Sequence, residues 1–131
     1  MGDWKIPTDC KFTKSDEWIK VEGDSATAGI TDYAQDQLSD LVFVELPKVG
    51  VSFKQGEAFG VVESVKAAGD VNLPVGGEVT AVNGDLNDSP ETINEDPFGK
   101  GWLVKFKIAD KSELDSLMDA AAYKAYCDER E

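Results

Sequence analysis

The sequence predicts a mainly β fold with added helices, in which short strands form a small barrel or sandwich. Three observations lead to this prediction. The chain of 131 residues has the length of one domain, so we treat residues 1–131 as a single domain. Short runs of β-branched and aromatic residues alternate with turn signals up to residue 108. A helical pattern occupies the end of the chain, so we expect a core over about 12–108 and helices over 112–129.

Seven runs predict strands because they are rich in β-branched and aromatic residues and end at turn residues. They cover 18–22, 25–30, 41–46, 58–65, 70–73, 77–83 and 102–108. Gly23-Asp24 lies between the first two runs and predicts a hairpin, and Pro47 ends the third. Thr31 is placed to cap a short helix over 32–38. We expect a turn-rich link over 50–56 and a polar loop over 85–101, with one helical turn after Ser89-Pro90.

The C-terminal segment carries helix signals in both its cap and its spacing. Ser112 predicts an N-cap, because acidic residues follow it in what would be the first turn. The Ala-rich run that follows predicts a helix that continues to Glu129. We expect its inner face to consist of Ala122, Tyr123, Tyr126 and Cys127. These aromatic residues predict packing rather than a cofactor site.

The charge balance excludes some classes of partner. Acidic residues number 26 against 13 basic residues, which gives a net charge of −13. Nucleic acid and anionic membranes bind clustered Lys and Arg, so neither is an expected partner. The acidity suits a protein that meets basic patches on partners, and it suits solubility alone equally well. The chain contains no histidine, so the commonest general base and metal ligand is missing, and we expect no metal site.

The sequence favours a reducing compartment. Cys10 and Cys127 are isolated and lack metal-ligand spacing, which is typical of reduced thiols. No apolar run is long enough to span a membrane, and Met1–Ile6 lacks the apolar core of a signal peptide. We therefore expect the cytoplasm, or the mitochondrial matrix for a processed eukaryotic chain.

Lys66 is the residue with the clearest functional pattern. Val61, Val62 and Val65 lead up to it, small residues follow it, and a second strand-like run begins at Asp70. This order predicts strand, tight turn and strand, with the lysine at the tip. A lysine there is an amine on a flexible stem that another enzyme can reach, so covalent modification would make it a swinging arm. The alternative is a plain solvated turn lysine.

Several segments together resemble the glycine cleavage system H-protein family. Glu63-Ser64-Val65-Lys66-Ala67 is similar to the lipoylation motif of that family. The likeness extends over nearly the whole chain, and the matching segments come in the same order as in the family. They are 16–20, 28–35, 42–47, 74–79, 82–83, 94–97 and 101–103.

The resemblance implies a flattened β-barrel sandwich of the biotinyl/lipoyl type, with lipoate attached to Lys66 through an amide. It also implies a non-catalytic carrier that moves the aminomethyl group of glycine and electrons between enzymes. The implied partners are a pyridoxal-phosphate glycine decarboxylase, a tetrahydrofolate-dependent aminomethyltransferase, an FAD-dependent dihydrolipoyl dehydrogenase and lipoylating enzymes. Because a carrier visits several active sites, we expect a monomer.

The resemblance also assigns roles to residues around Lys66. Glu63, Ser64, Val65 and Ala67 belong to the modification motif, in which Glu63 either steers the lipoylating enzyme or is a solvated strand acid. Glu17 and Asp70 are placed beside a cleft for the aminomethyl-bearing arm, and Ser15 adds a hydroxyl near Glu17. The alternative for Glu17 is a solvated acid at the start of a hairpin.

Several positions depart from the family pattern, among them Ala68-Gly69, Leu73 and three positions before residue 40. Asp16 and Gln37 stand where members commonly have histidine, and Ser39 stands where a glycine is common. None of the three lies in the lysine motif. They affect how the arm would dock, especially any step that needs a titrating imidazole.

Other interpretations remain open at this stage. An H-like carrier that relays lipoyl groups to other complexes would share the same lysine motif, and an unmodified interaction module could keep the same fold. A biotin carrier typically has methionine on both sides of its lysine, whereas Val65 and Ala67 flank Lys66. An enzyme has little support, since the sequence shows no nucleophile elbow, phosphate loop or metal cluster.

Overall fold

The computed structural model describes residues 4–130. The predicted domain of residues 1–131 therefore extends beyond the described residues at both ends, by residues 1–3 and 131. The elements are β1 (Lys11–Phe12), β2 (Glu17–Glu22), β3 (Ser25–Ile30), α1 (Asp32–Leu38), β4 (Leu41–Glu45), β5 (Ser52–Phe53), β6 (Ala58–Ser64), β7 (Ala68–Asn72), β8 (Gly77–Val82), the 3₁₀ helix η1 (Gly84–Asn87), α2 (Thr92–Glu95), β9 (Val104–Ile108), the 3₁₀ helix η2 (Lys111–Ser116) and α3 (Ala120–Glu129). The mainly β prediction is therefore confirmed.

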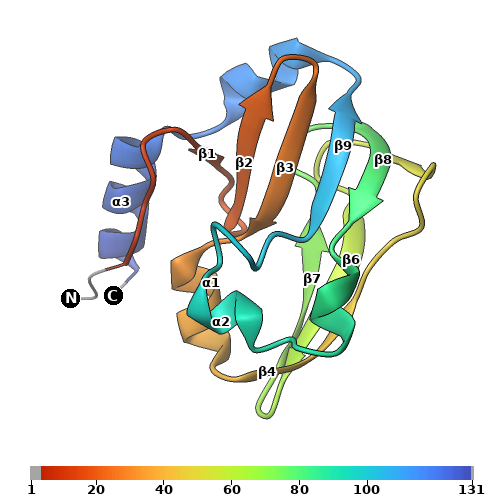
Figure 1. Ribbon diagram of the computed structural model, residues 1–131. Helices are drawn as coiled ribbons and strands as arrows, with labels where there is room; N and C mark the ends of the chain where they lie inside the picture. The colour runs from red at the N-terminus through yellow and green to blue at the C-terminus, as the bar shows by residue number, and fades with distance from the viewer. Residues whose placement is uncertain (1–3, 131) are drawn as a thin grey trace.

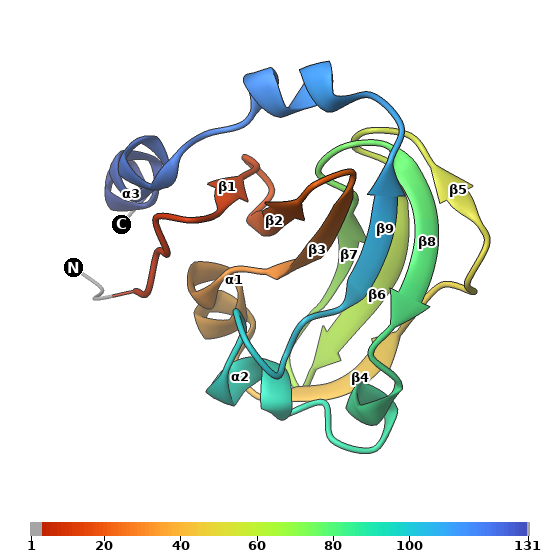
Figure 2. The ribbon, with the colours of Figure 1, turned by 45° about the horizontal axis from the view of Figure 1, so that its top comes forward.

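The strands form two antiparallel sheets that face each other as a sandwich (Figures 1 and 2). One sheet has the order β1-β2-β3-β9-β8-β5, and the other has the order β4-β6-β7. No strand is paired with both sheets in the described part of the chain, so the sandwich is not a closed barrel. The β6–β7 hairpin, which carries the lysine motif, projects from one end of the molecule (Figure 1).

Both predicted hairpins are present, and the residues that specify their turns and strands lie within a few positions of each other. β2 pairs with β3 from Glu17↔Ile30 to Glu22↔Ser25. Gly23 in the turn has φ +65°, a conformation that glycine adopts without steric cost. β6 pairs with β7 from Ala58↔Asn72 to Glu63↔Ala68, which leaves residues 65–67 to make the turn.

The strand β4 packs closely against β6, the first strand of the lysine hairpin. β4 pairs with β6, and a bulge lies between Leu41 and Phe43. A Cβ added to Gly60 would lie 2.5 Å from the carbonyl oxygen of Glu45, so β4 and β6 can approach here only because position 60 is glycine. The bulge leaves both Val42 and Phe43 exposed on the surface beside the hairpin.

Three segments differ from the sequence prediction. The expected link over 50–56 contains β5, which pairs with β8, and the prediction missed β1, which pairs with β2. The expected polar loop over 85–101 contains the helical turn α2, as predicted, and its first residues belong to the additional helix η1. A strand of two residues is too short to show an alternating pattern in the sequence. Such strands form because a neighbouring strand stabilises them.

The C-terminal prediction was wrong about the helix start. Asp110, not Ser112, caps η2, since its carboxylate accepts a hydrogen bond from the backbone N–H of Ser112 at 3.0 Å. Met118 then exchanges two backbone hydrogen bonds with Phe12, at 2.8 and 2.9 Å, so the helix is interrupted there. Asp119 caps a separate helix, α3, by accepting from the N–H of Ala122 at 2.8 Å.

The core consists of two hydrophobic clusters. The larger lies between the sheets and takes side chains from both, among them Ile19, Ala28, Val62, Val71 and Phe106. The smaller lies under α3 and contains Cys10, Phe12, Trp18, Tyr33, Tyr123 and Cys127. The rings of Phe12 and Tyr123 stack in it at 4.6 Å between centroids.

The predicted inner face of the C-terminal helix is partly right. Tyr123 and Cys127 are buried and Tyr126 is half-buried, but Ala122 is exposed. Both cysteines are buried and unpaired. Burial raises the pKa of Cys10 to about 12, with a smaller contribution from Asp9, so the thiol stays protonated.

No helix in residues 4–130 has the length and apolar character needed to cross a bilayer.

Candidate functional site

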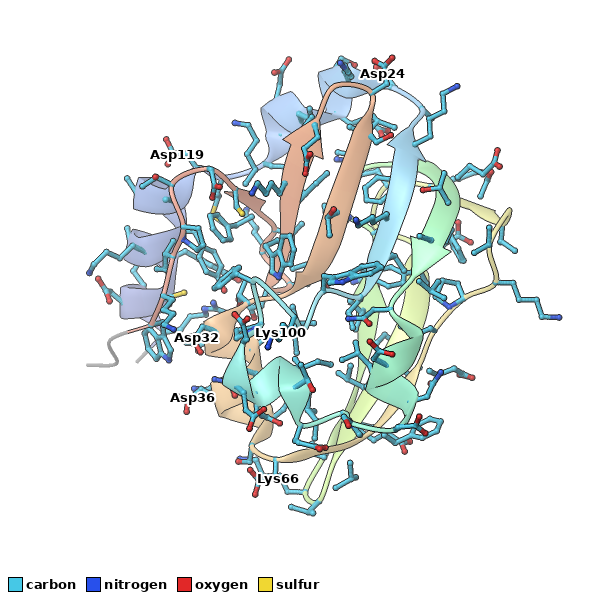
Figure 3. The ribbon with its side chains drawn as sticks, in the orientation of Figure 1. Asp24, Asp32, Asp36, Lys66, Lys100 and Asp119 are labelled. Atoms are coloured by element: carbon cyan, nitrogen blue, oxygen red, sulfur yellow. The ribbon has the colours of Figure 1, made fainter. Side chains whose placement is uncertain are left out.

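Lys66 lies at the tip of the β6–β7 hairpin, at the end of the molecule away from Asp24 (Figure 3). Its side chain is exposed. The strand pairing ends at Glu63↔Ala68, so the backbone on both sides of the turn is held by the sheet. The hairpin therefore presents a primary amine on a short turn whose two flanking strands are paired.

The hydroxyl of Ser64 organises this turn. Its Oγ accepts hydrogen bonds from the backbone N–H of Lys66 at 3.3 Å and from that of Ala67 at 3.1 Å. Oγ also donates to the carbonyl of Ala67 at 3.1 Å, and the N–H of Ser64 donates to the same carbonyl at 2.7 Å. One side chain thus bonds the N–H groups of Lys66 and Ala67 and the carbonyl of Ala67, which restrains the shape of the turn.

The surface around the tip is apolar as well as charged. Val65 is 75% exposed, and Val42 and Phe43 of β4 are 55% and 49% exposed. Glu63 is exposed and stands opposite Phe43 in the strand pairing. An enzyme that reaches Lys66 therefore meets aliphatic and aromatic side chains beside a carboxylate.

A cleft of about 200 Å³ lies beside the base of this hairpin. It has three walls: the turn before β2, the helix α1, and the strands β6 and β7. The lining residues are Ser15, Asp16, Glu17, Ile30, Ala34, Gln37, Leu38, Val62, Gly69, Asp70 and Val71. The structure thus brings the predicted residues Ser15, Glu17 and Asp70 together, although they come from segments more than 50 residues apart.

Glu17 is a buried acid with three hydrogen-bond donors around it. Its side chain is 1% exposed, so the solvated-acid alternative is wrong. Oε1 accepts from the hydroxyls of Thr13 and Ser15, and Oε2 accepts from the backbone N–H of Asn72 at 3.1 Å. Burial raises the pKa of Glu17, and the bonds from Ser15, Thr13 and Asn72 oppose this shift. Glu17 therefore also ties the start of β2 to the end of β7.

Asp70 has a different environment. It is exposed on β7, three residues after Ala67, and no hydrogen bond or ion pair engages its carboxylate among the described residues. A strand rises about 3.3 Å per residue, so Asp70 lies on the order of 10 Å along the strand from the turn. It is the cleft carboxylate that remains available to a ligand.

The structure shows a set of side-chain interactions around Asp16 that the sequence did not predict. Asp16, in the turn before β2, receives hydrogen bonds from Tyr123 and from Arg130 near the C-terminus. The sequence offered one signal, since Arg130 is the only arginine among the 13 basic residues. Its partner could not be known, because 114 positions separate the two residues.

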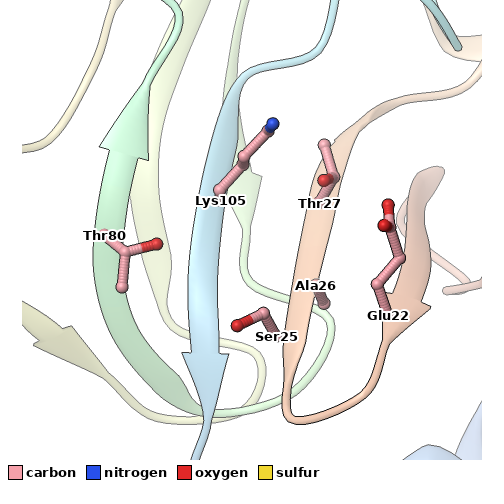
Figure 4. Close-up of a pocket in the computed structure, with 6 residues that line it drawn as sticks. All are labelled: Glu22, Ser25, Ala26, Thr27, Thr80 and Lys105. Carbon is pink, nitrogen blue, oxygen red and sulfur yellow. The ribbon is translucent and has the colours of Figure 1, made fainter.

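A second hollow, of about 300 Å³, lies on the outer face of the six-stranded sheet. Figure 4 shows that Glu22, Lys105 and short side chains line it across β2, β3, β9 and β8. Its two titratable residues, Glu22 and Lys105, are both exposed. In residues 4–130, no cluster of His, Cys, Asp or Glu could hold a metal ion.

The fold and the hairpin define a class of protein: two-sheet β-sandwich domains that present a lysine at a hairpin tip. The sequence model of the family described as "Glycine cleavage H-protein" matches residues 10–130. The chain therefore belongs to the glycine cleavage H-protein family, whose members are lipoyl-bearing carrier subunits of the glycine cleavage system and not enzymes.

Individual relatives agree with this assignment. The glycine cleavage system H protein of Halothermothrix orenii is 54% identical over 96% of this chain and 98% of its own length. The "Glycine cleavage system H protein 2, mitochondrial" of Arabidopsis thaliana is 49% identical over 94% of this chain and 79% of its own length. The crystal structure of an H protein from Mycobacterium marinum superposes with a TM-score of 0.85 at 38% identity, over 92% of this chain and 97% of that one.

Proposed function

We propose that Lys66 carries lipoate in amide linkage and that the chain acts as the shuttle of the glycine cleavage system. In this role it accepts the aminomethyl group of glycine from a pyridoxal-phosphate decarboxylase and delivers it to a tetrahydrofolate-dependent aminomethyltransferase. It then passes electrons to an FAD-dependent dihydrolipoyl dehydrogenase. When bound, the lipoyl group supplies a disulfide that can be reductively opened and a long tether.

The position of Lys66 is the observation that carries this proposal. The lysine lies within the matched family segment, at the tip of a paired hairpin, and its turn is shaped by the Ser64 hydroxyl. A lipoylating enzyme needs an accessible amine, and Lys66 is exposed. The neighbouring Glu63 and Val65 are also exposed, so they can take part in recognition.

The cleft beside the hairpin fits an arm of this chemistry. Its apolar residues, which include Ile30, Leu38, Val62 and Val71, can cover an aliphatic chain. Asp70 offers a free carboxylate to a cationic amine at the end of the arm. Partial enclosure would also keep water from an aminomethyl group, which hydrolyses readily.

Glu17 and Ser15 have a supporting role in this proposal. Glu17 stays buried and bonded to Ser15 and Asn72, so it holds two walls of the cleft together. When ionised, the same group adds negative potential to the cleft while it keeps its hydrogen bonds. Ser15 fixes one oxygen of Glu17 and lines the cleft itself.

The whole surface supports encounters with several enzymes. A net charge of −13 favours association with basic patches, where charge sets the rate of encounter more than affinity. A monomer suits visits to different active sites. We place this activity in the cytoplasm, or in the mitochondrial matrix if the chain is a processed eukaryotic one.

Glycine–bicarbonate exchange with a purified glycine decarboxylase tests the shuttle role. We expect exchange that depends on the lipoylated chain, and none with Lys66→Arg, which keeps the charge and the fold but cannot be lipoylated. A chain that is lipoylated at Lys66 but inactive in exchange would contradict the shuttle role. That result would favour an H-like carrier that relays lipoyl groups.

A further inference from the structure

One chain of side chains joins the C-terminal helix to two walls of the cleft. Arg130 donates to both carboxylate oxygens of Asp16, from Nη1 to Oδ2 at 3.0 Å and from Nη2 to Oδ1 at 2.6 Å. Asp16 lines the cleft between Ser15 and Glu17 and has φ +72°, a left-handed conformation. The wall that contains Glu17 is thus held by a bidentate ion pair from the C-cap residue of α3.

Arg130 is itself fixed by aromatic rings. Its guanidinium lies 4.1 Å from the ring centroid of Tyr33 and 4.0 Å from that of Tyr126. Tyr126 belongs to α3, and Tyr33 belongs to α1. A planar guanidinium between two rings loses little further freedom when it binds a carboxylate. The pair is therefore more ordered than an ordinary surface ion pair.

Tyr123 extends the connection to the second wall. Its hydroxyl donates to Oδ1 of Asp16 at 2.8 Å and accepts from the hydroxyl of Thr31, with the oxygens 2.6 Å apart. Thr31 is the N-cap of α1, and its Oγ1 accepts from the N–H of Ala34 at 3.1 Å. Ala34 lines the cleft, together with the rest of the inner face of α1.

We propose that Tyr123 and Arg130 are positioning residues for the cleft, and that they set the spacing between the turn before β2 and the helix α1. This inference rests on the proposed function, since it assigns these residues to the retention of the aminomethyl-bearing arm. α3, which lies on the side of these elements away from the cleft-lining strands β6 and β7 (Figure 2), then acts as a brace.

A purely electrostatic role makes the opposite prediction. Removal of the Arg130 charge would leave Asp16 uncompensated, make the cleft more negative and hold a cationic amine more tightly. A brace predicts weaker retention, because the walls lose their common attachment. Arg130→Lys separates shape from charge further, since lysine keeps the charge but lacks the fork and the planar stacking surface.

The first test uses the unmodified chain and amide hydrogen exchange. We expect Arg130→Ala, Arg130→Lys and Tyr123→Phe to speed exchange at Thr31, whose N–H is bonded to Asp16, and at Asn72, whose N–H is bonded to Glu17. Amides in the β8–β9 pairing should keep their wild-type rates. Asp128→Asn is the matched control, because it breaks the ion pair with Lys124 on the same helix without contacting Asp16.

The second test measures how well the arm is retained. Each chain is lipoylated, loaded with glycine and the decarboxylase, and left without the aminomethyltransferase. Water then cleaves the S–CH₂–NH₃⁺ group, so that the C–S and C–N bonds break and formaldehyde, ammonium and the free thiol form. We expect this release to be roughly threefold to tenfold faster in the three brace variants, because each loses hydrogen bonds to a charged group.

The outcomes separate this inference from the proposed function. Wild-type retention in Arg130→Ala and Tyr123→Phe, or slower release in Arg130→Ala, would overturn the brace while lipoylation at Lys66 still stood. Faster release that also appears in Asp128→Asn would reduce the effect to general loss of α3 stability and likewise overturn it. A wild-type chain that takes no lipoyl group would contradict the proposed function itself, and the hydrogen-exchange test of the brace would remain valid.

Discussion

Glu17 combines a structural and an electrostatic role within one side chain. It is almost fully buried, yet three donors from Thr13, Ser15 and Asn72 satisfy its oxygens. Burial of an acid without such partners would be costly, so the hydrogen bonds are what allow a carboxyl group at this depth. The residue type could be predicted to matter from the sequence, but its burial could not.

The raised pKa of Glu17 predicts a specific pH dependence. Burial penalises the ionised form in the fold, so the contribution of Glu17 to stability is complete below its ordinary pKa of 4.5 and is lost as the pH rises through its raised pKa. We expect the free energy of unfolding of the wild type, relative to Glu17→Gln, to fall as the pH rises above 4.5. Urea unfolding at several pH values measures this difference. A difference that grows with pH would show that the three donors outweigh burial.

Ser39 adopts a backbone conformation that suits only glycine. Its φ and ψ are +68° and −154°, in the region where a side chain costs about 1–3 kcal/mol. Its N–H donates to Gln35 and its carbonyl accepts from Asn94, and glycine would keep both bonds. We expect Ser39→Gly to raise the free energy of unfolding by about 1 kcal/mol, after the entropy cost of glycine. The matched control is Ser25→Gly, in a strand with ordinary geometry, which should lower it; a loss at Ser39 would contradict the strain argument.

The lysine turn shows how an element controls the presentation of one residue. The sheet holds both strands up to Glu63↔Ala68, and Ser64 supplies the remaining hydrogen bonds. The turn is exposed, so its loss would hardly affect global stability. Its geometry should matter more for modification, because an enzyme has to align the amine with an activated acyl group.

Ser64→Ala tests this directly. We expect lipoylation at Lys66 to slow by about threefold to tenfold, because the turn loses its organising hydroxyl, while the free energy of unfolding falls by no more than about 1 kcal/mol. Ser64→Thr keeps the hydroxyl and should restore much of the rate. Wild-type lipoylation rates in Ser64→Ala would contradict a positioning role for this hydroxyl.

Elements with local signals could be predicted from the sequence, and elements that depend on distant partners could not. The β2–β3 and β6–β7 hairpins and the Thr31 cap follow from turn residues and side-chain periodicity within a few positions. The break between η2 and α3 follows instead from the pairing of Met118 with Phe12, more than 100 residues away. The same limit applies to the cleft region, where the position of Lys66 at a hairpin tip was predictable and the bond between Asp16 and Arg130 was not.

At the scale of the whole molecule, the two hydrophobic clusters stabilise the fold, whereas the large negative charge destabilises it. The clusters between the sheets and under α3 bury the aromatic and aliphatic side chains that drive folding. A net charge of −13 on a chain of 131 residues opposes compaction through self-repulsion. Ion pairs such as Lys20–Asp9 and Lys111–Asp24 are exposed and contribute little.

This balance predicts a salt effect on stability. We expect the Tm to rise by a few degrees as NaCl increases from about 0.01 M to about 0.2 M, because added ions screen the repulsion between acidic residues. Differential scanning calorimetry at constant pH measures it. A Tm that falls with salt would mean that attractive ion pairs dominate the electrostatics of the fold.

The most direct test of the central claim is mass spectrometry of the chain after incubation with a lipoate ligase, lipoate and ATP. The account predicts a single lipoyl mass gain that maps to the peptide containing Lys66, and no gain with Lys66→Arg. A folded chain that gains no mass, or that gains it on another lysine, would contradict the assignment of Lys66 as the carrier residue.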